Sequence, residues 1–346
     1  MFGRRNNRRG RRCLAAVTAC AFAAVAARAN VMNLPAGETS LQFVTVGNPG
    51  NAPDSTGYGA VPYTYQMGEF DVTVAQYTQF LNAVAASDPY GLWNPSMSPG
   101  STSASCGITR SGSSGSYTYS FAGSDPNFPV NNASWLSAAR FCNWLENGQP
   151  TGAEGTGTTE TGAYALNGAT GAETNQQLAG ITRSPGAIYV IPSENEWYKA
   201  AYYDPENRSY WLYPTQSDST PTSVLSATGT NNANYEEPGV GSSDPTTGLT
   251  PVGSFVDSPG PYGTYDMGGD VFQWTEGFDG GVRVVRGGSF FSDAAGMSSG
   301  ARVALGPSQQ VGTVGFRIAQ VPEPGSIGIL AFVGLFLLRR RRSASV

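Results

Sequence analysis

The chain has 346 residues, of which 40% are hydrophobic and 13% charged, and it contains 45 glycines and 23 prolines. That length allows one large domain or two small ones, and the composition favours a loop-rich domain over a helical bundle. Residues 30–320 carry nine basic and 24 acidic side chains, a net charge of −15. This argues against nucleic acid as a partner, because phosphate binding needs a basic face.

Histidine is absent from the whole chain. Its absence excludes Ser-His-Asp and Cys-His catalysis, and it excludes metal sites that depend on histidine ligands. Two of the four cysteines, Cys106 and Cys142, lie outside the N-terminal segment. A disulfide between them is chemically allowed in an exported protein. The sequence leaves their pairing open.

Residues 1–29 are interpreted as a secretory signal peptide. Arg4–Arg12 is basic, Leu14–Ala27 is apolar, and Ala27-Arg28-Ala29 fits the small-x-small cleavage pattern. The apolar run is too short to span a membrane comfortably. A signal peptide is therefore favoured over a membrane anchor.

The first regular elements are two strands and a helix. Leu41–Val46 predicts a strand, and Tyr63–Tyr65 predicts the start of the next. Apolar residues then recur at helical spacing within Met67–Ala86. Thr73, followed three residues later by Gln76, predicts a capping box at the start of this helix.

A second helix is predicted within Pro129–Gly148, with Ser134 as its N-cap. Cys142 falls on its apolar face and is interpreted as a buried small hydrophobe, not a nucleophile. Ser96–Tyr119 is rich in serine and glycine, and Gln149–Pro185 is rich in glycine, threonine and alanine. Both segments are predicted to be exposed loops.

Ile188–Trp197 predicts a strand that leads into a third helix. Ser193 and Glu196 have the spacing of a second capping box. Glu194 and Glu196 are two carboxylates that suggest acid–base catalysis. The alternative is favoured, because acidic residues in a first helical turn interact well with the helix dipole and its free N–H groups.

The densest stretch of motifs is Tyr262–Phe291. Gly268-Gly269 allows a sharp backbone bend. Val271–Trp274 predicts one strand, Asp279–Gly281 a turn, and Val282–Arg286 a second strand. The stretch is therefore expected to form strands joined by tight turns.

Several segments together resemble the formylglycine-generating enzyme, or sulfatase-modifying factor, family. They are Val72–Phe80 (VTVAQYTQF), Pro129–Trp144 (PVNNASWLSAARFCNW), Ile191–Ala201 (IPSENEWYKAA), Gly263–Trp274 (GTYDMGGDVFQW) and Arg283–Phe290 (RVVRGGSF). The resemblance covers about residues 65–320. It implies an α+β fold of the C-type-lectin-like type, with short strands, two or three helices and long loops.

The resemblance does not extend to the residues that carry the family's oxidase chemistry. In the enzymes, two cysteines after the R-G-G-S segment hold copper and activate oxygen to convert a substrate cysteine to formylglycine, and thiolates suit Cu(I). Those positions fall near Ser292 and Met297 here. The histidine-ligated iron of the sulfoxide-synthase branch is excluded as well. No copper is expected.

The resemblance also implies calcium sites made of loop oxygens. Asp270 and Gln273 stand where the family has asparagine and glutamate, and Asn234 with the backbone of Tyr235 matches a second site. Carboxylate, amide and backbone oxygens suit Ca²⁺. Ordinary turn and strand roles remain the alternative for all four residues.

The C-terminal segment, residues 321–346, resembles a PEP-CTERM sorting signal of Gram-negative bacteria. Val321–Gly325 (VPEPG) is followed by the apolar run Ile327–Leu338 and by Arg339–Arg342. The resemblance implies transient membrane association, removal of the tail by an exosortase, and delivery to the cell surface, outer membrane or extracellular matrix. A simple C-terminal transmembrane helix is the alternative, although twelve apolar residues are few for one.

Three functions therefore stay open for the domain spanning residues 30–320. The favoured one is a binding or matrix-associated module, with a glycan or extended peptide in a groove lined by tryptophan and tyrosine. Its rival is an oxidase or formylglycine-forming enzyme with a non-standard metal site. The third is a hydrolase that uses carboxylates such as Asp266 and Asp270.

Overall fold

A computed structural model describes residue 32 and residues 40–101, 105–121, 125–226, 228–238 and 248–322. The predicted signal peptide lies outside the described residues, as do the apolar run and the arginine cluster of the sorting signal. The account below concerns the domain between them.

The described strands are short. They are β1 (Phe43–Val46), β2 (Tyr65–Gly68), β3 (Thr109–Ser111), β4 (Thr118–Ser120), β5 (Tyr189–Val190), β6 (Tyr203–Asp204), β7 (Ser209–Tyr210), β8 (Phe272–Asp279), β9 (Val282–Arg286), β10 (Val303–Leu305), β11 (Val314–Gly315) and β12 (Ala319–Gln320). The helices are α1 (Val74–Val84), α2 (Trp135–Glu146), α3 (Asn175–Ala179) and α4 (Glu194–Tyr202), with 3₁₀ turns η1 (Pro95–Met97) and η2 (Ala294–Met297).

Two four-stranded sheets organise this part of the chain. One has the order β1-β2-β12-β5 and is antiparallel throughout. The other has the order β10-β9-β8-β11, with β11 parallel to β8. The predicted turn between β8 and β9 is confirmed, and the register shifts between Trp274 and Phe278, as in a bulge. Only Phe316–Ile318 separates β11 from β12, so the end of the domain joins both sheets.

The predicted helix starts are confirmed. Thr73 and Gln76 form a reciprocal capping box at α1, and Ser134 accepts the Ser137 amide at α2. Ser193 and Glu196 form the expected box at α4. Because each cap satisfies amide groups that the helix itself leaves free, these short helices begin at defined residues.

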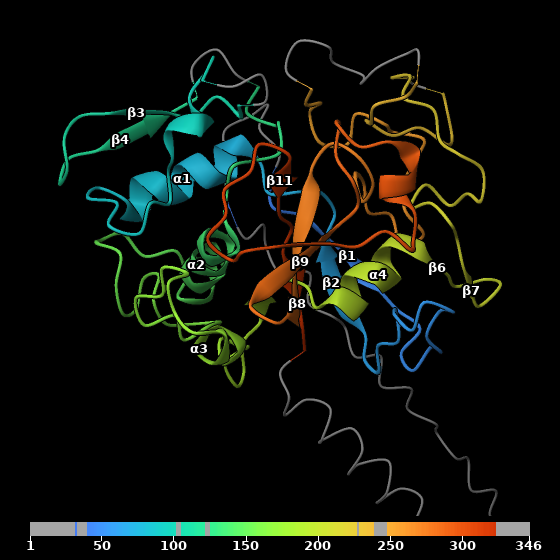
Figure 1. Ribbon diagram of the computed structural model, residues 1–346, viewed down its shortest axis with the longest axis horizontal. Coiled ribbons are helices and arrows are strands. Elements are labelled where there is room, and N and C mark those ends of the chain that lie inside the picture. Colours follow the sequence, from blue (N-terminus) through green and yellow to red (C-terminus); the bar gives the residue numbers. More distant parts are fainter. Residues whose placement is uncertain are drawn as a thin grey trace, which may run out of the picture.

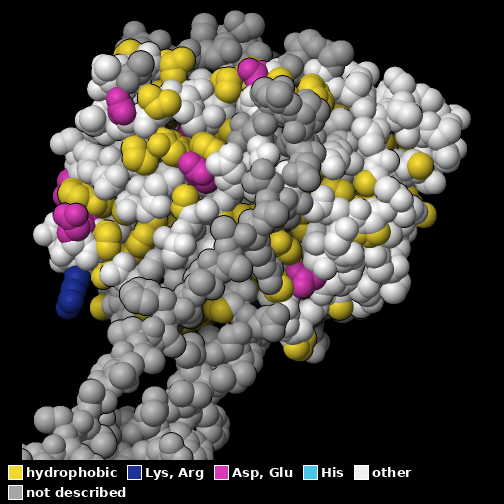
Figure 2. Space-filling view, turned by 180° about the vertical axis from the view of Figure 1, so that it is seen from behind, with side chains coloured by type: hydrophobic (Ala, Val, Ile, Leu, Met, Phe, Trp, Pro, Cys, Tyr) yellow, Lys and Arg dark blue, Asp and Glu magenta, His cyan; other side chains and the backbone are white. Residues whose placement is uncertain are grey.

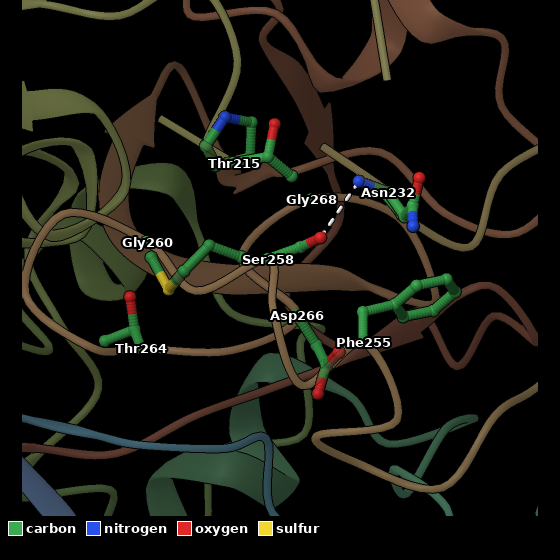
Figure 3. A pocket seen from close by; sticks show the side chains of 11 residues that line it. Thr215, Asn232, Phe255, Ser258, Gly260, Thr264, Asp266 and Gly268 are labelled. Atoms are coloured by element: carbon green, nitrogen blue, oxygen red, sulfur yellow. Dashed lines mark hydrogen bonds between the residues drawn. The ribbon is translucent and has the colours of Figure 1, made fainter. Parts of the chain in front are cut away.

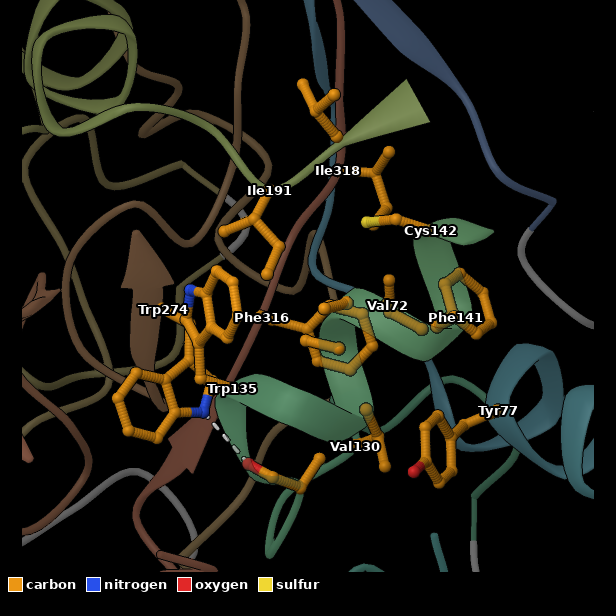
Figure 4. Close-up of a cluster of buried hydrophobic side chains, with 14 of the residues drawn as sticks. Val72, Tyr77, Val130, Trp135, Phe141, Cys142, Ile191, Trp274, Phe316 and Ile318 are labelled. Carbon is orange, nitrogen blue, oxygen red and sulfur yellow. Dashed lines mark hydrogen bonds between the residues drawn. The ribbon is translucent and has the colours of Figure 1, made fainter. Parts of the chain in front are cut away.

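The helices flank the central strands. In Figure 1, α1, α2 and the hairpin β3–β4 lie on one side of β8, β9 and β11, and α4 with β6–β7 lies on the other. The core between α1, α2 and the strands is aromatic: Phe141 stacks or packs edge-on against Tyr77 and Phe316. Figure 4 shows these rings beside Trp135 and Trp274.

Four of the six tryptophans belong to the buried core, so these four do not line a binding groove. Trp135, Trp144, Trp197 and Trp274 are at most 1% exposed. Two of their indole N–H groups are satisfied by backbone: Trp135 donates to the Thr275 carbonyl at 3.0 Å and Trp274 to that of Ala133 at 2.9 Å. Buried indoles with satisfied N–H groups have a packing role.

The prediction of an exposed loop over Gln149–Pro185 is correct only in part: most of its residues are exposed or half-buried, but it contains the helix α3 and several buried side chains. Tyr164 is fully buried there, and Glu160, 5% exposed, pairs with Arg140 of α2 at 2.6 Å. Further along, Arg183 pairs with Glu196 and Glu276 at 2.6 and 2.8 Å. A single buried ring and a few charges are invisible to a periodicity search, yet they fix the segment to the core.

Ser96–Tyr119 also departs from the prediction, because it contains the hairpin β3–β4. Arg110 of this hairpin lies between the rings of Trp93 and Tyr117, at 4.1 and 4.2 Å from their centroids. Cys106 is buried there, and Cys142, as predicted, is buried on α2. Both are thiols, and no disulfide joins them.

The surface carries few charged groups. On the face shown in Figure 2, most described side chains are uncharged, and those that are charged are mainly acidic. Within the described ranges, no helix is long and apolar enough to cross a bilayer.

Candidate functional site

The turn before β8 brings the two predicted calcium segments together. Asp270 has a positive φ of 56°, and its amide donates to the Asn234 carbonyl at 2.7 Å. A Cβ on Gly269 would lie 2.2 Å from the same carbonyl oxygen. Glycine is therefore required at residue 269, since any side chain would push the two segments apart.

Asp270 is 1% exposed and is held by three donors. Its Oδ1 accepts from the Asn234 amide at 3.1 Å and from the Thr250 backbone at 3.2 Å, and its Oδ2 accepts from the Thr250 hydroxyl at 3.1 Å. Burial, reinforced by the nearby Asp266 charge, raises its pKa well above the ordinary aspartate value. The Asp270 carboxylate is therefore held in place by hydrogen bonds, but its negative charge is poorly compensated by its surroundings.

Gln273 lies at the centre of a second, fully buried network. Its Oε1 accepts from Trp197 Nε1 and Arg317 Nε, each at 2.7 Å. Its Nε2 donates to the Asp266 carbonyl at 2.6 Å and to Asp71 Oδ2 at 3.3 Å. The oxygen and the NH₂ group of the Gln273 amide therefore both have their hydrogen-bond partners within the protein. A calcium ion would have to compete with Trp197 and Arg317 for its oxygen.

Asp71, Asp266, Asp270 and Arg317 form a buried charge cluster that the sequence motifs did not reveal. The Arg317 guanidinium lies 3.5 Å from Asp71 Oδ1, an ionic contact too long to be a hydrogen bond. Burial raises the pKa of Asp71 to about 8 and that of Asp266 to about 6, against the opposing effect of Arg317. Asp71 and Asp266 share the Arg317 guanidinium, and Asp270 is affected by the charges of these two carboxyls.

The R-G-G-S turn, from Arg286 to Ser289, lies against the same region. Neither glycine leaves room for a side chain: a Cβ on Gly287 would approach the Met267 carbonyl oxygen to 2.7 Å, and a Cβ on Gly288 would approach the Met297 side chain to 3.0 Å. The Ser292 hydroxyl is turned inward: it accepts from the Ser289 amide at 3.0 Å and lies 3.3 Å from the Ser289 hydroxyl.

These positions do not fit a bis-thiolate copper site. Ser292 supplies a hydroxyl engaged by Ser289, and Met297 supplies a fully buried thioether packed with Tyr213 and Tyr235. The two thiols of the described domain lie elsewhere, and burial raises the pKa of Cys106 to about 11 and that of Cys142 well above its ordinary value. Neither forms the thiolate that Cu(I) prefers.

The calcium residues fit their expected ion only in part. Asp270 and Asn234 are in contact, whereas the Tyr235 carbonyl, the atom expected as a ligand, accepts from the Glu237 amide at 3.0 Å. Asn234 also donates to the Gly248 carbonyl at 2.7 Å, so its amide would have to turn for its oxygen to meet a cation. Among the residues the structure describes, no three acidic or cysteine side chains converge as metal ligands.

Glu194 and Glu196 have structural partners, as the helix-dipole interpretation favoured. Glu194 Oε1 accepts from Arg286 and Arg302 at 2.8 and 3.0 Å. Glu196 is ion-paired with Arg183, whose charge holds the pKa of this carboxyl below its ordinary value despite burial. Both carboxylates stabilise the junction between α4 and the β8–β9 hairpin.

Three large apolar side chains are exposed on segments near the R-G-G-S turn, and the sequence analysis did not identify them. Phe291 is 75% exposed, and Val224 and Leu225 are each 53% exposed. Their segments are tied together, since the Glu236 amide donates to the Ser292 carbonyl at 2.9 Å and Ser223 donates to Glu237 at 2.6 Å.

The fold and this site define an α+β domain of the C-type-lectin-like type, with a glycine-rich turn between two small sheets. Comparison with known families agrees: residues 25–321 match the sulfatase-modifying factor enzyme 1-like domain. The chain therefore belongs to the sulfatase-modifying factor family. Residues 320–342 match the PEP-CTERM protein-sorting motif, which indicates export, recognition by an exosortase and surface sorting in a Gram-negative bacterium.

Solved structures share the fold. The crystal structure of CarF matches with a TM-score of 0.50 and 20% identity over 82% of this chain and 98% of the other. Treponema denticola variable protein 1 matches with a TM-score of 0.50 and 19% identity over 84% and 98%. No curated protein matches the chain.

Proposed function

We propose that this exported, surface-sorted protein uses its sulfatase-modifying factor domain as a binding module and has lost the family's copper oxidase chemistry. The observation that carries the proposal is the pair Ser292 and Met297 after the R-G-G-S turn, with both thiols of the described domain buried elsewhere. The rival is an oxidase with a non-standard metal site.

An activity assay separates the two. Purified residues 30–320 are incubated with copper, oxygen and a sulfatase-type cysteine peptide, beside a working enzyme of the family as positive control. We expect the peptide mass to remain unchanged. Conversion of its cysteine to formylglycine would refute the binding-module proposal and require a copper site built without the expected thiolates.

The ligand we propose is an extended peptide or a glycan that contacts the patch of Phe291, Val224 and Leu225. Glu236 is exposed at its border and adds a hydrogen-bond acceptor. Glycan-array and peptide pull-down screens with the wild-type domain provide the test. Phe291→Ala should abolish retention of a hit, whereas Val303→Ala, at an exposed residue of β10, should not.

Calcium is proposed as a stabilising ion at Asp270 and Asn234, not as a reactant. Calorimetry with CaCl₂ should show binding, and Asp270→Ala should remove both the heat and the calcium-dependent rise in melting temperature. A null titration of the wild-type domain would eliminate this site and leave Asp270 with a purely structural role.

A further inference from the structure

Buried oxygens without a hydrogen-bond partner occur in two different settings in the described domain. Thr264 Oγ1 is one of them, and Figure 3 shows this residue with Ser258 and Asp266 around a small pocket. The pocket has a volume of about 10 Å³, which is room for one water that can satisfy the hydroxyl. Glu154 is the more demanding case, because both oxygens of its carboxyl are buried without a partner.

Glu154 lies in a turn formed by residues 151–157, most of which are exposed. A backbone hydrogen bond from the Gly152 amide to the Ala83 carbonyl, at 3.0 Å, ties this turn to the end of α1. The Glu154 side chain reaches inward from the same turn. The turn is therefore attached to the domain by a backbone bond and by a buried carboxyl.

The Glu154 carboxyl makes no hydrogen bond to the residues that the structure describes. The Tyr90 amide faces it and favours its ionised form, but does not reach hydrogen-bond geometry. Burial without a partner penalises a carboxylate far more than a carboxylic acid, because the charged form loses much stronger hydration. The closed turn therefore favours the protonated carboxyl.

The charged side chains around Glu154 are paired with other residues. Arg140 of α2 donates to Glu160 at 2.6 and 3.1 Å, and Asp88 accepts from Arg110 at 3.2 Å. The charges of Asp88 and Glu160 oppose ionisation of Glu154, and that of Arg140 favours it. Burial is the largest effect, and the pKa of Glu154 is raised to about 8.

Two tyrosines face the same carboxyl from other elements. Tyr77 of α1 donates its hydroxyl proton to the Leu92 carbonyl at 2.8 Å, and Tyr119 of β4 donates to the Ala85 carbonyl at 2.8 Å. Each hydroxyl has one proton to give, so neither can satisfy an ionised Glu154. Burial and the nearby acidic groups raise the pKa of both tyrosines, which therefore stay neutral.

We propose that Glu154 is a pH-sensitive latch, which holds the 151–157 turn against α1 while its carboxyl is protonated and releases the turn when the carboxyl ionises. Opening exposes Glu154 to water, where its pKa returns to the ordinary value of about 4.5. Between about 4.5 and 8 the closed turn keeps a proton that the open turn has lost, so rising pH favours opening by at most about tenfold per pH unit. The latch is tightest below this range, and above it no further change is expected.

The test follows hydrogen exchange at the Gly152 amide by NMR on the purified exported protein, between about pH 5 and pH 9, after correction for the intrinsic pH dependence of exchange. We expect the protection of this amide to fall by up to about tenfold per pH unit as far as about pH 8, and then to level off. Protection that stays constant over the whole range would overturn the proposal.

Three variants locate the effect. Glu154→Gln is neutral at every pH, so protection at Gly152 should become independent of pH. Glu206→Gln, at an exposed site, and Asp71→Asn, far from this turn in the sequence, should both keep the wild-type profile. A wild-type profile in Glu154→Gln would refute the latch; if that variant fails to fold, the profile of the wild-type protein decides.

Discussion

At the scale of single residues, Gln273 shows how a family position can change its role. The family has a glutamate there, whereas this chain has an amide that accepts from Trp197 and Arg317 and donates to the Asp266 carbonyl. A carboxylate could accept but not donate. The family motif pointed to residue 273 but not to its hydrogen-bond partners, because one of them, Arg317, lies 44 residues further along the chain.

Gln273→Ala should lower the free energy of unfolding by about 2–4 kcal/mol, because it leaves the Trp197 indole and the Arg317 guanidinium without their acceptor. Gln273→Glu keeps the acceptor but sets a carboxylate oxygen against the Asp266 carbonyl and Asp71, so it should cost at least as much. Urea denaturation measures both, with exposed Gln42→Ala as the control. An Ala variant as stable as the wild type would show that the hydrogen bonds of Gln273 are unimportant.

Asp71 makes a prediction about pH. Burial raises its pKa in the folded state to about 8, above the value of about 4 expected when unfolded. Between these two values the folded state retains a proton that the unfolded state has lost, so stability at this site falls as pH rises from about 4 to 8, by at most about 1.4 kcal/mol per pH unit.

Asp71→Asn removes that titration. The free energy of unfolding is measured by urea denaturation, with a chelator present, for the wild type and for the variant. The difference, wild type minus variant, should decrease steadily between about pH 5 and pH 8, because this interval lies between the unfolded and folded pKa values of Asp71. A difference that is flat, or that rises with pH, would mean that the Arg317 contact keeps Asp71 ionised in the folded domain.

At the scale of elements, local signals predicted the capped helices but not the buried contacts of the segment 149–185. Thr73, Ser134 and Ser193 each act within one helical turn, so their caps can be recognised from neighbouring residues. Tyr164 and Glu160 are fixed by contacts with α2 and β8 instead. Contacts between distant segments leave no periodic trace in a glycine-rich stretch.

The pair of Glu160 and Arg140 should make that segment essential for stability. Glu160 accepts two bonds from Arg140, at 2.6 and 3.1 Å, and one from the Gly168 amide at 2.7 Å. Glu160→Gln leaves the buried guanidinium uncompensated and should cost about 3 kcal/mol in urea denaturation. Glu173→Gln, near the surface of the same segment, should cost less than about 1 kcal/mol; equal costs would refute a special role for the buried pair.

At the scale of the whole molecule, the resemblance predicted the fold class because it rests on motifs spread from residue 65 to residue 320. The sequence could not show the charge cluster, since Asp71, Asp266 and Arg317 come from three distant segments. It also could not show that four of the tryptophans are buried. An aromatic residue looks the same in a core and in a groove until the packing is known.

The C-terminal strands of the domain, β11 and β12, should be as important to folding as any helix. β11 pairs with β8 of one sheet and β12 with β2 and β5 of the other, and Phe316, Arg317 and Ile318 between them are fully buried. A chain ending at residue 322 keeps all of these contacts, whereas a chain ending at residue 313 loses them.

We expect truncation after Pro322 to leave the melting temperature of the domain unchanged, because it removes only residues of the sorting signal. Truncation after Thr313 should give no cooperative transition by circular dichroism or calorimetry, since both sheets lose a strand and the Arg317 partners lose their guanidinium. A cooperative transition in the shorter chain would show that the two sheets are stable without their shared C-terminal strands. If truncation after Pro322 leaves the melting temperature unchanged, removal of the tail by an exosortase at or beyond residue 322 would release a domain that is already fully folded.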